Sequence, residues 1–459
     1  MRFRTGHVVA FSLVLAAACN RPAELSLDTR TESTSVLTTT APVPDTVARE
    51  PQPSVSSHNQ PETSGWPNLF GPHHNSHSTE TAARVTWPPT GPTVPWRVPV
   101  GTGYSSPITD GAHVFVSHRI GDREIVECFA AETGGSLWKS DFPTTFVCKV
   151  AYSDGPYSTP VLRDGRLFVM GAQGQLRCLG AADGRLIWER LLQPEYGLTD
   201  GTFPISTSPF PHGELLIVNV GGKQAGIVAF KQATGEPVWS ATSDAASCAT
   251  PVAAEIHGRE HLFVFTYEGL TFLTPGAGDV LWKFPYRPKN PETIIATSPV
   301  VHGELVIASG YQLGTLCVRV REDGHFEQQW HEPRALDSQY NNLICHDGLL
   351  FGFSAIDKTL RCVDVATGKL HWKWRSKLGR GNMIVVNGHL LIVGQAGHFG
   401  SLRINVRKPE CVALTSAPLL EGPVYAAPAL CQGRLYLRNE MELVCVDLRE
   451  EDRVAGAWR

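Results

Sequence analysis

Residues 360–374 read Leu-Arg-Cys-Val-Asp-Val-Ala-Thr-Gly-Lys-Leu-His-Trp-Lys-Trp. A short strand leads into a Thr-Gly turn, and a second strand that carries Trp372 follows. Glycine accepts the positive φ that a tight hairpin turn requires. Alternation of apolar and polar residues in such strands, as in residues 176–179, is typical of a sheet packed on both faces. The stretch therefore predicts a β-hairpin, and its pattern recurs along the chain.

Each repeat begins with Ser/Thr-Pro-Val or a variant of it and reaches a first turn that ends in glycine. These first-turn glycines are Gly111, Gly165, Gly213, Gly258, Gly303, Gly348, Gly388 and Gly433. The intervals between them are 54, 48, 45, 45, 45, 40 and 45 residues, so they define eight units. A tryptophan follows the second-turn glycine by four residues in Gly134/Trp138, Gly184/Trp188, Gly235/Trp239, Gly278/Trp282 and Gly368/Trp372. The fifth unit stretches this interval to six residues, and the seventh unit lacks the tryptophan.

Four short strands in each unit form a propeller blade. The eighth unit stops at Asp447 without its tryptophan strand, and a matching strand at residues 94–98 precedes the first unit. We expect this strand to complete the last blade and close the ring, which removes open sheet edges. The sequence predicts an all-β, eight-bladed β-propeller of four-stranded antiparallel blades over residues 94–448, followed by a C-terminal tail, 449–459.

The N-terminus has the pattern of an export signal. Two arginines precede an apolar stretch, residues 8–18, that is too short to span a bilayer as a helix. Residues 15–19, Leu-Ala-Ala-Ala-Cys, resemble a bacterial lipobox, although Ala16 stands where that motif usually has leucine. We predict a lipoprotein signal peptide, 1–18, and lipidation of Cys19; the alternative is a secretory signal with an incidental cysteine. Asn20 after the cysteine favours the outer membrane, so we expect an exported lipoprotein in the periplasm or at the outer membrane.

Residues 19–64 are rich in threonine, serine and proline and have no hydrophobic periodicity, which predicts a disordered tether. Residues 65–93 are expected to form an extended segment against the propeller flank, held by Trp66 and Phe70. His73, His74 and His77 cluster in this segment. A metal site would need a fixed scaffold and usually a carboxylate or thiolate partner, so a loop role is the simpler interpretation and no metal ligand is assigned.

The formal net charge of −4, from 40 basic and 44 acidic residues, argues against nucleic acid as a partner. A nucleic-acid binder needs a basic face that neutralises phosphates. No later segment is apolar for long enough to cross a membrane as a helix. Contact with the membrane is therefore expected only through the lipid anchor.

The Asp/Thr-Gly-x-x-x-Trp pattern, preceded by a strand such as residues 360–366, resembles the repeat of the pyrroloquinoline quinone (PQQ)-binding-like propeller family. The resemblance covers about residues 94–448 and implies the fold more strongly than an activity. Quinoprotein dehydrogenases of that superfamily use PQQ, calcium, an aspartate base, a stacking tryptophan and, in many members, a disulfide between adjacent cysteines. This chain has no adjacent cysteines and no Cys-x-x-Cys-His haem motif. No calcium ligand or catalytic aspartate matches residue by residue, so no catalytic, cofactor-binding or metal residue is assigned.

Five cysteines occupy the same strand position in five blades: Cys128, Cys178, Cys317, Cys362 and Cys445. Facing sheets lie roughly 10 Å apart, whereas a disulfide needs Cα atoms within roughly 7 Å. We expect these five to be buried thiols that pack as small apolar groups. The pairing of the others stays open: Cys148, Cys248, Cys345, Cys411 and Cys431.

Propellers bind through loops at their faces. Three loops that link the outer strand of one blade to the inner strand of the next exceed the repeat and should gather on one face. Their candidate binding residues are Phe142, Phe146, Tyr152, Tyr196, Phe203, Tyr286 and Arg287. Aromatic and arginine side chains on a rigid rim suit protein or saccharide contact, and ordinary packing between blades is the alternative.

Two functions are compatible with these features. The favoured hypothesis is a non-enzymatic, lipid-anchored scaffold that presents a propeller face to a protein partner in the cell envelope. The alternative is a PQQ-dependent oxidoreductase with an atypical or degenerate site. Addition of PQQ and calcium to the purified protein, with thermal shift and dye reduction as readouts, would distinguish them, because the scaffold needs no cofactor.

Overall fold

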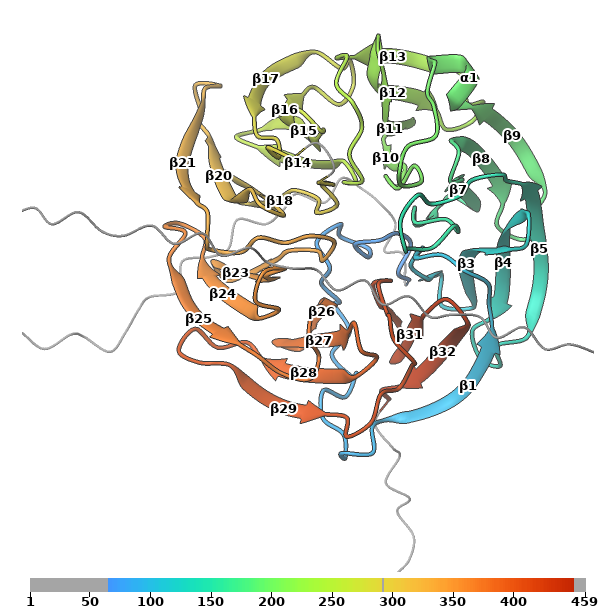
Figure 1. Ribbon diagram of the computed structural model, residues 1–459, viewed down its shortest axis with the longest axis vertical. Helices are drawn as coiled ribbons and strands as arrows, with labels where there is room; N and C mark the ends of the chain where they lie inside the picture. The colour runs from blue at the N-terminus through green and yellow to red at the C-terminus, as the bar shows by residue number, and fades with distance from the viewer. Residues whose placement is uncertain (1–64, 291–292, 450–459) are drawn as a thin grey trace, which may run out of the picture. The chain divides into compact units, whose positions relative to one another are not determined.

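The computed structural model describes residues 65–290 and 293–449, which lie within one compact unit, residues 53–459. The predicted signal peptide, Cys19, the tether and residues 450–459 lie outside the described residues. Eight four-stranded antiparallel sheets are arranged in a ring, as Figure 1 shows. The predicted eight-bladed propeller is confirmed, with the blade register that the first-turn glycines define.

Blades 1 to 4 follow one another along the chain, each from its inner to its outer strand. Blade 1 contains β2 (Ile108–Thr109), β3 (His113–Ile120), β4 (Arg123–Ala130) and β5 (Ser136–Pro143). Blade 2 contains β6 (Val161–Arg163), β7 (Arg166–Met170), β8 (Gln175–Gly180) and β9 (Leu186–Leu191). A short helix, α1 (Leu192–Tyr196), follows it. Blade 3 contains β10 (Phe210–His212), β11 (Leu215–Gly222), β12 (Ala225–Lys231) and β13 (Pro237–Ala241). Blade 4 contains β14 (Val252–Ile256), β15 (Arg259–Phe265), β16 (Gly269–Leu273) and β17 (Val280–Pro285).

Blades 5 to 7 have the same order. Blade 5 contains β18 (Val300–His302), β19 (Leu305–Gly310), β20 (Gly314–Val320) and β21 (Phe326–Glu332). Blade 6 contains β22 (Ile344–His346), β23 (Leu349–Phe353), β24 (Leu360–Asp364) and β25 (Leu370–Trp374). Blade 7 contains β26 (Gly381–Val386), β27 (His389–Gly394), β28 (Phe399–Arg403) and β29 (Glu410–Leu414). Blade 8 combines β30 (Ala429–Cys431), β31 (Arg434–Arg438) and β32 (Glu442–Asp447) with β1 (Thr93–Pro99).

The strand before the first unit closes the ring, as predicted. β1 pairs antiparallel with β32, with Trp96 opposite Cys445. Arg438 of blade 8 also links this blade to blade 1. Its guanidinium donates to the carbonyl oxygens of Ser117 and Gly101, both at 2.8 Å. Complete burial lowers the pKa of Arg438 to about 10, so the carbonyl contacts are needed to compensate for lost hydration. The first strand, β1, and the last three strands, β30 to β32, therefore share one blade (Figure 1).

The repeated tryptophans join each blade to the next. A Cβ placed on Gly184 would lie 2.4 Å from the ring of Trp138, so the indole lies directly on the glycine of the neighbouring second turn. The Trp138 indole N–H donates to the carbonyl of Ala181, 3.1 Å away, in the same neighbouring blade. The same bond to the next blade is made by Trp96, Trp188, Trp239, Trp330 and Trp372. In blade 4, Trp282 instead stacks on Phe326, because the fifth unit has the stretched turn.

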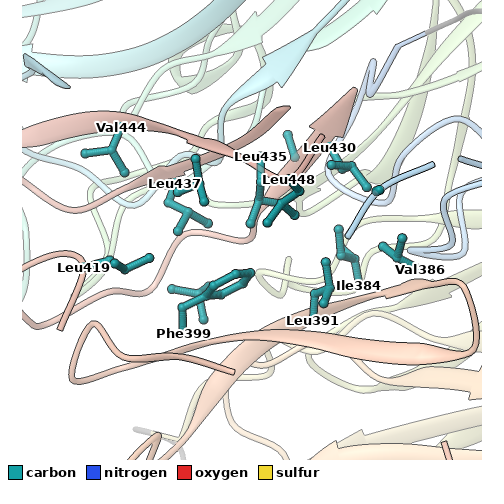
Figure 2. Close-up of a cluster of buried hydrophobic side chains, with 14 of the residues drawn as sticks. Ile384, Val386, Leu391, Phe399, Leu419, Leu430, Leu435, Leu437, Val444 and Leu448 are labelled. Atoms are coloured by element: carbon teal, nitrogen blue, oxygen red, sulfur yellow. The ribbon is translucent and has the colours of Figure 1, made fainter. Parts of the chain in front are cut away.

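Apolar side chains fill the gaps between blades. Figure 2 shows the cluster between blades 7 and 8, where Ile384, Leu391 and Phe399 face Leu430 and Leu435. Each of these side chains is almost inaccessible to solvent. Full burial of one such side chain contributes about 1.5–3 kcal/mol, so the interfaces between blades supply the main stabilisation.

The ten described cysteines are free thiols. The five in equivalent strand positions are fully buried, as predicted. Among the other five, Cys148 and Cys431 are buried, Cys248 and Cys345 are partly buried and Cys411 is exposed. Within the described residues, no helix has both the length and the apolar character needed to cross a membrane.

Candidate functional site

One face of the propeller, called here the turn face, carries the first turns of the blades, and residues 65–87 pack against much of it. Trp66 is buried and pairs with Thr109, the last residue of the inner strand of blade 1. Pro67 accepts a bond from the Leu162 N–H of blade 2, at 2.8 Å. The chain then reaches the far side of the ring, where Ser78 donates to the carbonyl of Val385 in blade 7. This segment therefore crosses the turn face from blade 1 to blade 7.

The far end of the segment is attached to blades 7 and 8. The Glu80 carboxylate accepts bonds from the backbone N–H groups of Gln432 and Gly433, in the first turn of blade 8. The Asn387 side chain donates to the carbonyl of Thr81 at 2.9 Å. Trp87 stacks on Phe399, with ring centroids 4.5 Å apart. Together with those of Trp66 and His74, these contacts hold the segment against the turn face of blades 1–3 and 6–8. On the same face, His257 and Glu304 in the first turns of blades 4 and 5 border a cavity.

The histidines of the segment have separate structural roles. His74 packs edge-on against Phe210, and His77 lies on His346 with ring nitrogens 3.2 Å apart. Burial lowers the pKa of both His74 and His77 to about 4, so both are neutral near pH 7. Across residues 65–290 and 293–449, no group of three or more His, Cys, Asp or Glu is placed to hold a metal ion.

The opposite face, called here the free face, carries the loops between blades and the turns between the second and third strands. Exposed apolar side chains there include Ile356 (71%) in blade 6 and a group of four: Ile120 (55%), Val147 (64%), Val150 (44%) and Met441 (55%). The group of four occupies one sector, because Met441 bonds through its carbonyl to the Val100 N–H beside blade 1. Arg119 fixes the loop of Val147 by donating to the carbonyl of Phe146 at 2.6 Å. We call these four residues the apolar rim; exposed apolar groups that cluster on a rigid face are typical of protein contact.

The predicted loop residues have different environments. Phe142 and Phe146 are buried, and the Arg177 guanidinium lies 4.6 Å from the Phe142 ring centroid. Tyr286 is also buried, and its hydroxyl donates to the carbonyl of Leu313 at 3.1 Å. Tyr196, at the end of α1, packs on the core residue Phe230. These four side chains pack within and between blades.

The other three predicted residues reach the surface or the axis. Arg287 is exposed at the free face. Tyr152 and Phe203 come together, with ring centroids 5.8 Å apart, and both line a cavity at the propeller axis. Only these two predicted residues therefore meet at a cavity.

Hydrogen bonds between blades form a chain around this axis and explain the recurrent Ser/Thr before proline. The backbone N–H of Ala427 donates to the Ser106 hydroxyl, and the Ser106 N–H donates to the hydroxyl of Thr159. The Thr159 N–H in turn donates to the hydroxyl of Ser208 in blade 3. Thr250 and Ser298 extend it through blades 4 and 5, and Asn342 and Asn382 take the same places in blades 6 and 7. These bonds link blade 8 to blade 1, blades 1 to 5 in series, and blade 6 to blade 7. Between blades 5 and 6 the Thr297 hydroxyl instead donates to the carbonyl of Asn341 at 3.5 Å.

The residue two positions before each of these ring residues faces the axis, and its size differs around the ring. Tyr104, Tyr157, Tyr340 and Tyr425 form an aromatic wall, in which Tyr425 lies 4.7 Å from both Tyr104 and Tyr340. Blades 3 to 5 contribute the small side chains of Ser206, Cys248 and Ala296. A cavity of about 130 Å³ lies between the two walls, and Leu69 of the turn-face segment also lines it. We call this cavity the axial pocket.

A family model described as outer membrane protein assembly factor BamB matches residues 122–374. The chain belongs to the BamB family. BamB of Burkholderia pseudomallei is 26% identical over 290 residues, which cover 61% of this chain and 68% of that protein. The solved structure of BamB from Moraxella catarrhalis is 14% identical, with a TM-score of 0.56 and coverage of 79% of this chain and 99% of that one. The family resemblance predicted from the repeat is confirmed.

Quinoprotein enzymes share the fold. Quinohemoprotein alcohol dehydrogenase from Comamonas testosteroni is 12% identical, with a TM-score of 0.61 over 87% of this chain and 83% of that one. A europium-containing methanol dehydrogenase is 11% identical, with a TM-score of 0.63 over 82% of this chain and 89% of that one. At these identities the likeness concerns the fold alone.

The axial pocket of this BamB-family chain does not fit PQQ with calcium. Calcium prefers several oxygen ligands that include carboxylates, and PQQ itself carries carboxylates that require positive partners. The described residues that line the pocket include no Asp, Glu, Lys or Arg. Arg380 lies beside it, but its guanidinium is held by Gln339 and Gln395 and covers the Tyr340 ring at 4.9 Å. No step of quinone chemistry is therefore derived from these residues.

Proposed function

We propose that this chain is a non-enzymatic propeller scaffold in outer-membrane protein assembly, whose free face binds a protein partner in the cell envelope. Membership of the BamB family supports the biological setting, because the relative from Burkholderia pseudomallei is named as an outer membrane protein assembly factor. The observation that carries the proposal is the contrast between the faces. Residues 65–87 occupy much of the turn face, whereas the apolar rim exposes four apolar side chains in one sector of the other face.

The point where the described chain enters the propeller is compatible with a free face that is open to a partner. The described chain begins at Gly65, beside Thr109 and Asp110 on the turn face. The polypeptide that leads from Cys19 therefore connects to the described chain at Gly65, on the turn face. We propose that lipidation at Cys19 attaches the protein to the envelope and leaves the rim accessible. Replacement of Cys19 by Ala should move the protein from the membrane fraction to the soluble fraction of the envelope, and an unchanged membrane fraction would show that another feature anchors it.

Capture of partners from detergent-solubilised envelopes tests the scaffold. A Val147→Glu, Met441→Glu double variant places two charges in the apolar rim and should reduce recovery of the partner roughly tenfold or more, equivalent to about 1.4 kcal/mol. Ile187→Glu is a matched control, because Ile187 is equally exposed but lies on the outer strand β9. Equal recovery with the rim variant and with the wild type would contradict the proposal.

A further inference from the structure

The axial pocket has the properties of a binding site that is separate from the apolar rim. It lies at the axis, where all eight blades contribute lining residues. Natural interiors are closely packed, so a persistent cavity between rigid strands requires an explanation. The cavity arises because blades 3 to 5 place Ser206, Cys248 and Ala296 where four other blades place tyrosine.

Several polar groups of the lining are already hydrogen-bonded within the chain. Asn382 accepts from the Asn342 N–H and donates to the carbonyl of Tyr425 at 2.7 Å. The Ser206 hydroxyl donates to the carbonyl of Pro204, also at 2.7 Å. The surface offered to an occupant is therefore mainly aromatic and aliphatic carbon. A charged occupant would lose its hydration without gaining an opposite charge, because the described lining residues carry no ionised side chain at neutral pH.

The volume of the pocket limits the size of the ligand that it can hold. Its volume of about 130 Å³ is close to that of an engineered apolar cavity, about 150 Å³, that binds benzene. Aromatic rings prefer edge-to-face or offset contacts with centroids about 4.5–7 Å apart. The Tyr104, Tyr340 and Tyr425 rings already lie at such distances from one another, so a further ring can continue their arrangement.

We propose that the axial pocket binds one uncharged aromatic ring, held between the tyrosine wall and the small side chains of Cys248 and Ala296. The ring can belong to a free small molecule or to an aromatic side chain of a polypeptide that approaches from the free face. The chemistry of recognition is the same in both cases. Tyr152 and Phe203, from two loops of the free face, stand at the pocket and would contact either ligand.

Methyl NMR of the folded protein tests this site, with Ile294, which lines the pocket, as the reporter. Four probes are titrated: p-cresol, the tripeptide acetyl-Ala-Phe-Ala-amide, benzoate and cyclohexanol. We expect saturable shifts of the Ile294 methyl signal with p-cresol, the tripeptide or both, and binding of benzoate and cyclohexanol roughly tenfold weaker or less. Tighter binding of the tripeptide would identify a polypeptide source, and tighter binding of p-cresol a small-molecule source. Absence of saturable shifts with both aromatic probes, or equal binding of cyclohexanol or benzoate, would overturn the proposal.

Variants of the small wall give the matched control. Ala296→Phe places a ring inside the pocket and should abolish the shifts, whereas Ala296→Ser keeps the volume and should bind as the wild type does. The melting temperature shows whether Ala296→Phe is folded, and Cys248→Leu fills the same wall if it is not. Undiminished binding by a folded variant with a filled pocket would place the ligand elsewhere and refute the assignment.

Discussion

The closure of the ring depends on Trp96, and its replacement by alanine should be strongly destabilising. Trp96 is 9% exposed, its ring contacts Gly134 of blade 1, and its indole N–H donates to the carbonyl of Ala131 at 3.1 Å. A buried tryptophan replaced by alanine costs about 3–5 kcal/mol, which includes the cavity that remains. We therefore expect Trp96→Ala to lower the free energy of unfolding by about 3–5 kcal/mol. Trp96→Phe keeps a ring but leaves the Ala131 carbonyl without its donor, and should cost about 1–3 kcal/mol.

Equilibrium unfolding in urea, followed by circular dichroism, measures these losses as the shift of the midpoint multiplied by the slope. Leu137→Ala is the control, because Leu137 lies on the outer strand of blade 1 and is 54% exposed. Its effect should lie within about 0.5 kcal/mol. If Trp96→Ala costs no more than this control, the strand β1 does not hold the ring closed and the structural reasoning is wrong.

Three further predictions concern other parts of the chain. Ser208→Ala leaves the buried N–H of Thr159 without an acceptor, and should lower the free energy of unfolding in urea by about 1–3 kcal/mol. Ser158→Ala is the control: it removes a buried hydroxyl with no partner among the described residues, and should be neutral or stabilising. Burial raises the pKa of Glu124 from 4.5 to about 7, so between these values the folded state binds a proton that the unfolded state does not. Stability should therefore fall as the pH rises from about 4.5 to 7. Glu124→Gln should make the melting temperature less dependent on pH over this range. Cys411 is the exposed thiol among the ten described cysteines, so Cys411→Ser should remove the fast phase of labelling of these ten by a maleimide, measured in a Cys19→Ser background. Persistence of that phase would show that another thiol, such as the partly buried Cys248 or Cys345, is equally accessible.

The blades could be predicted from the sequence because they depend on local chemistry that repeats. A glycine in each first turn and a tryptophan four residues after each second turn give the register directly. At His257-Gly258 both φ angles are positive, 52° and 70°, as a two-residue hairpin turn requires. The closing strand was also predictable, since the last unit lacked the strand that residues 94–98 supply.

The covered turn face was harder to predict, because it depends on contacts between segments hundreds of residues apart. The bonds from Glu80 to Gln432 and Gly433 have no periodic signal in the sequence. Trp66 and Phe70 indicated that the segment packs on the propeller, but not on which surface.

The sequence does carry a signal of the axial pocket. It appears when the units are aligned on the Ser/Thr-Pro pair and the residue two positions earlier is compared. That position is tyrosine in Tyr104 and Tyr157 but small in Cys248 and Ala296. Loop length instead favoured Phe142 and Tyr286, whose rings are buried, and Phe142 lies in the strand β5. Burial of such a ring depends on the neighbouring blade, which the length of a loop does not reveal.

Site-specific photo-cross-linking in intact cells tests the central claim most directly, namely that the free face binds a protein of the envelope. A photoreactive amino acid is placed at Val147, at Met441 and, as a control on the outer flank, at Ile187. The account predicts a discrete cross-linked envelope protein from Val147 and Met441, and none from Ile187. Cross-links of equal yield from Ile187, or none from the two positions of the apolar rim, would contradict it.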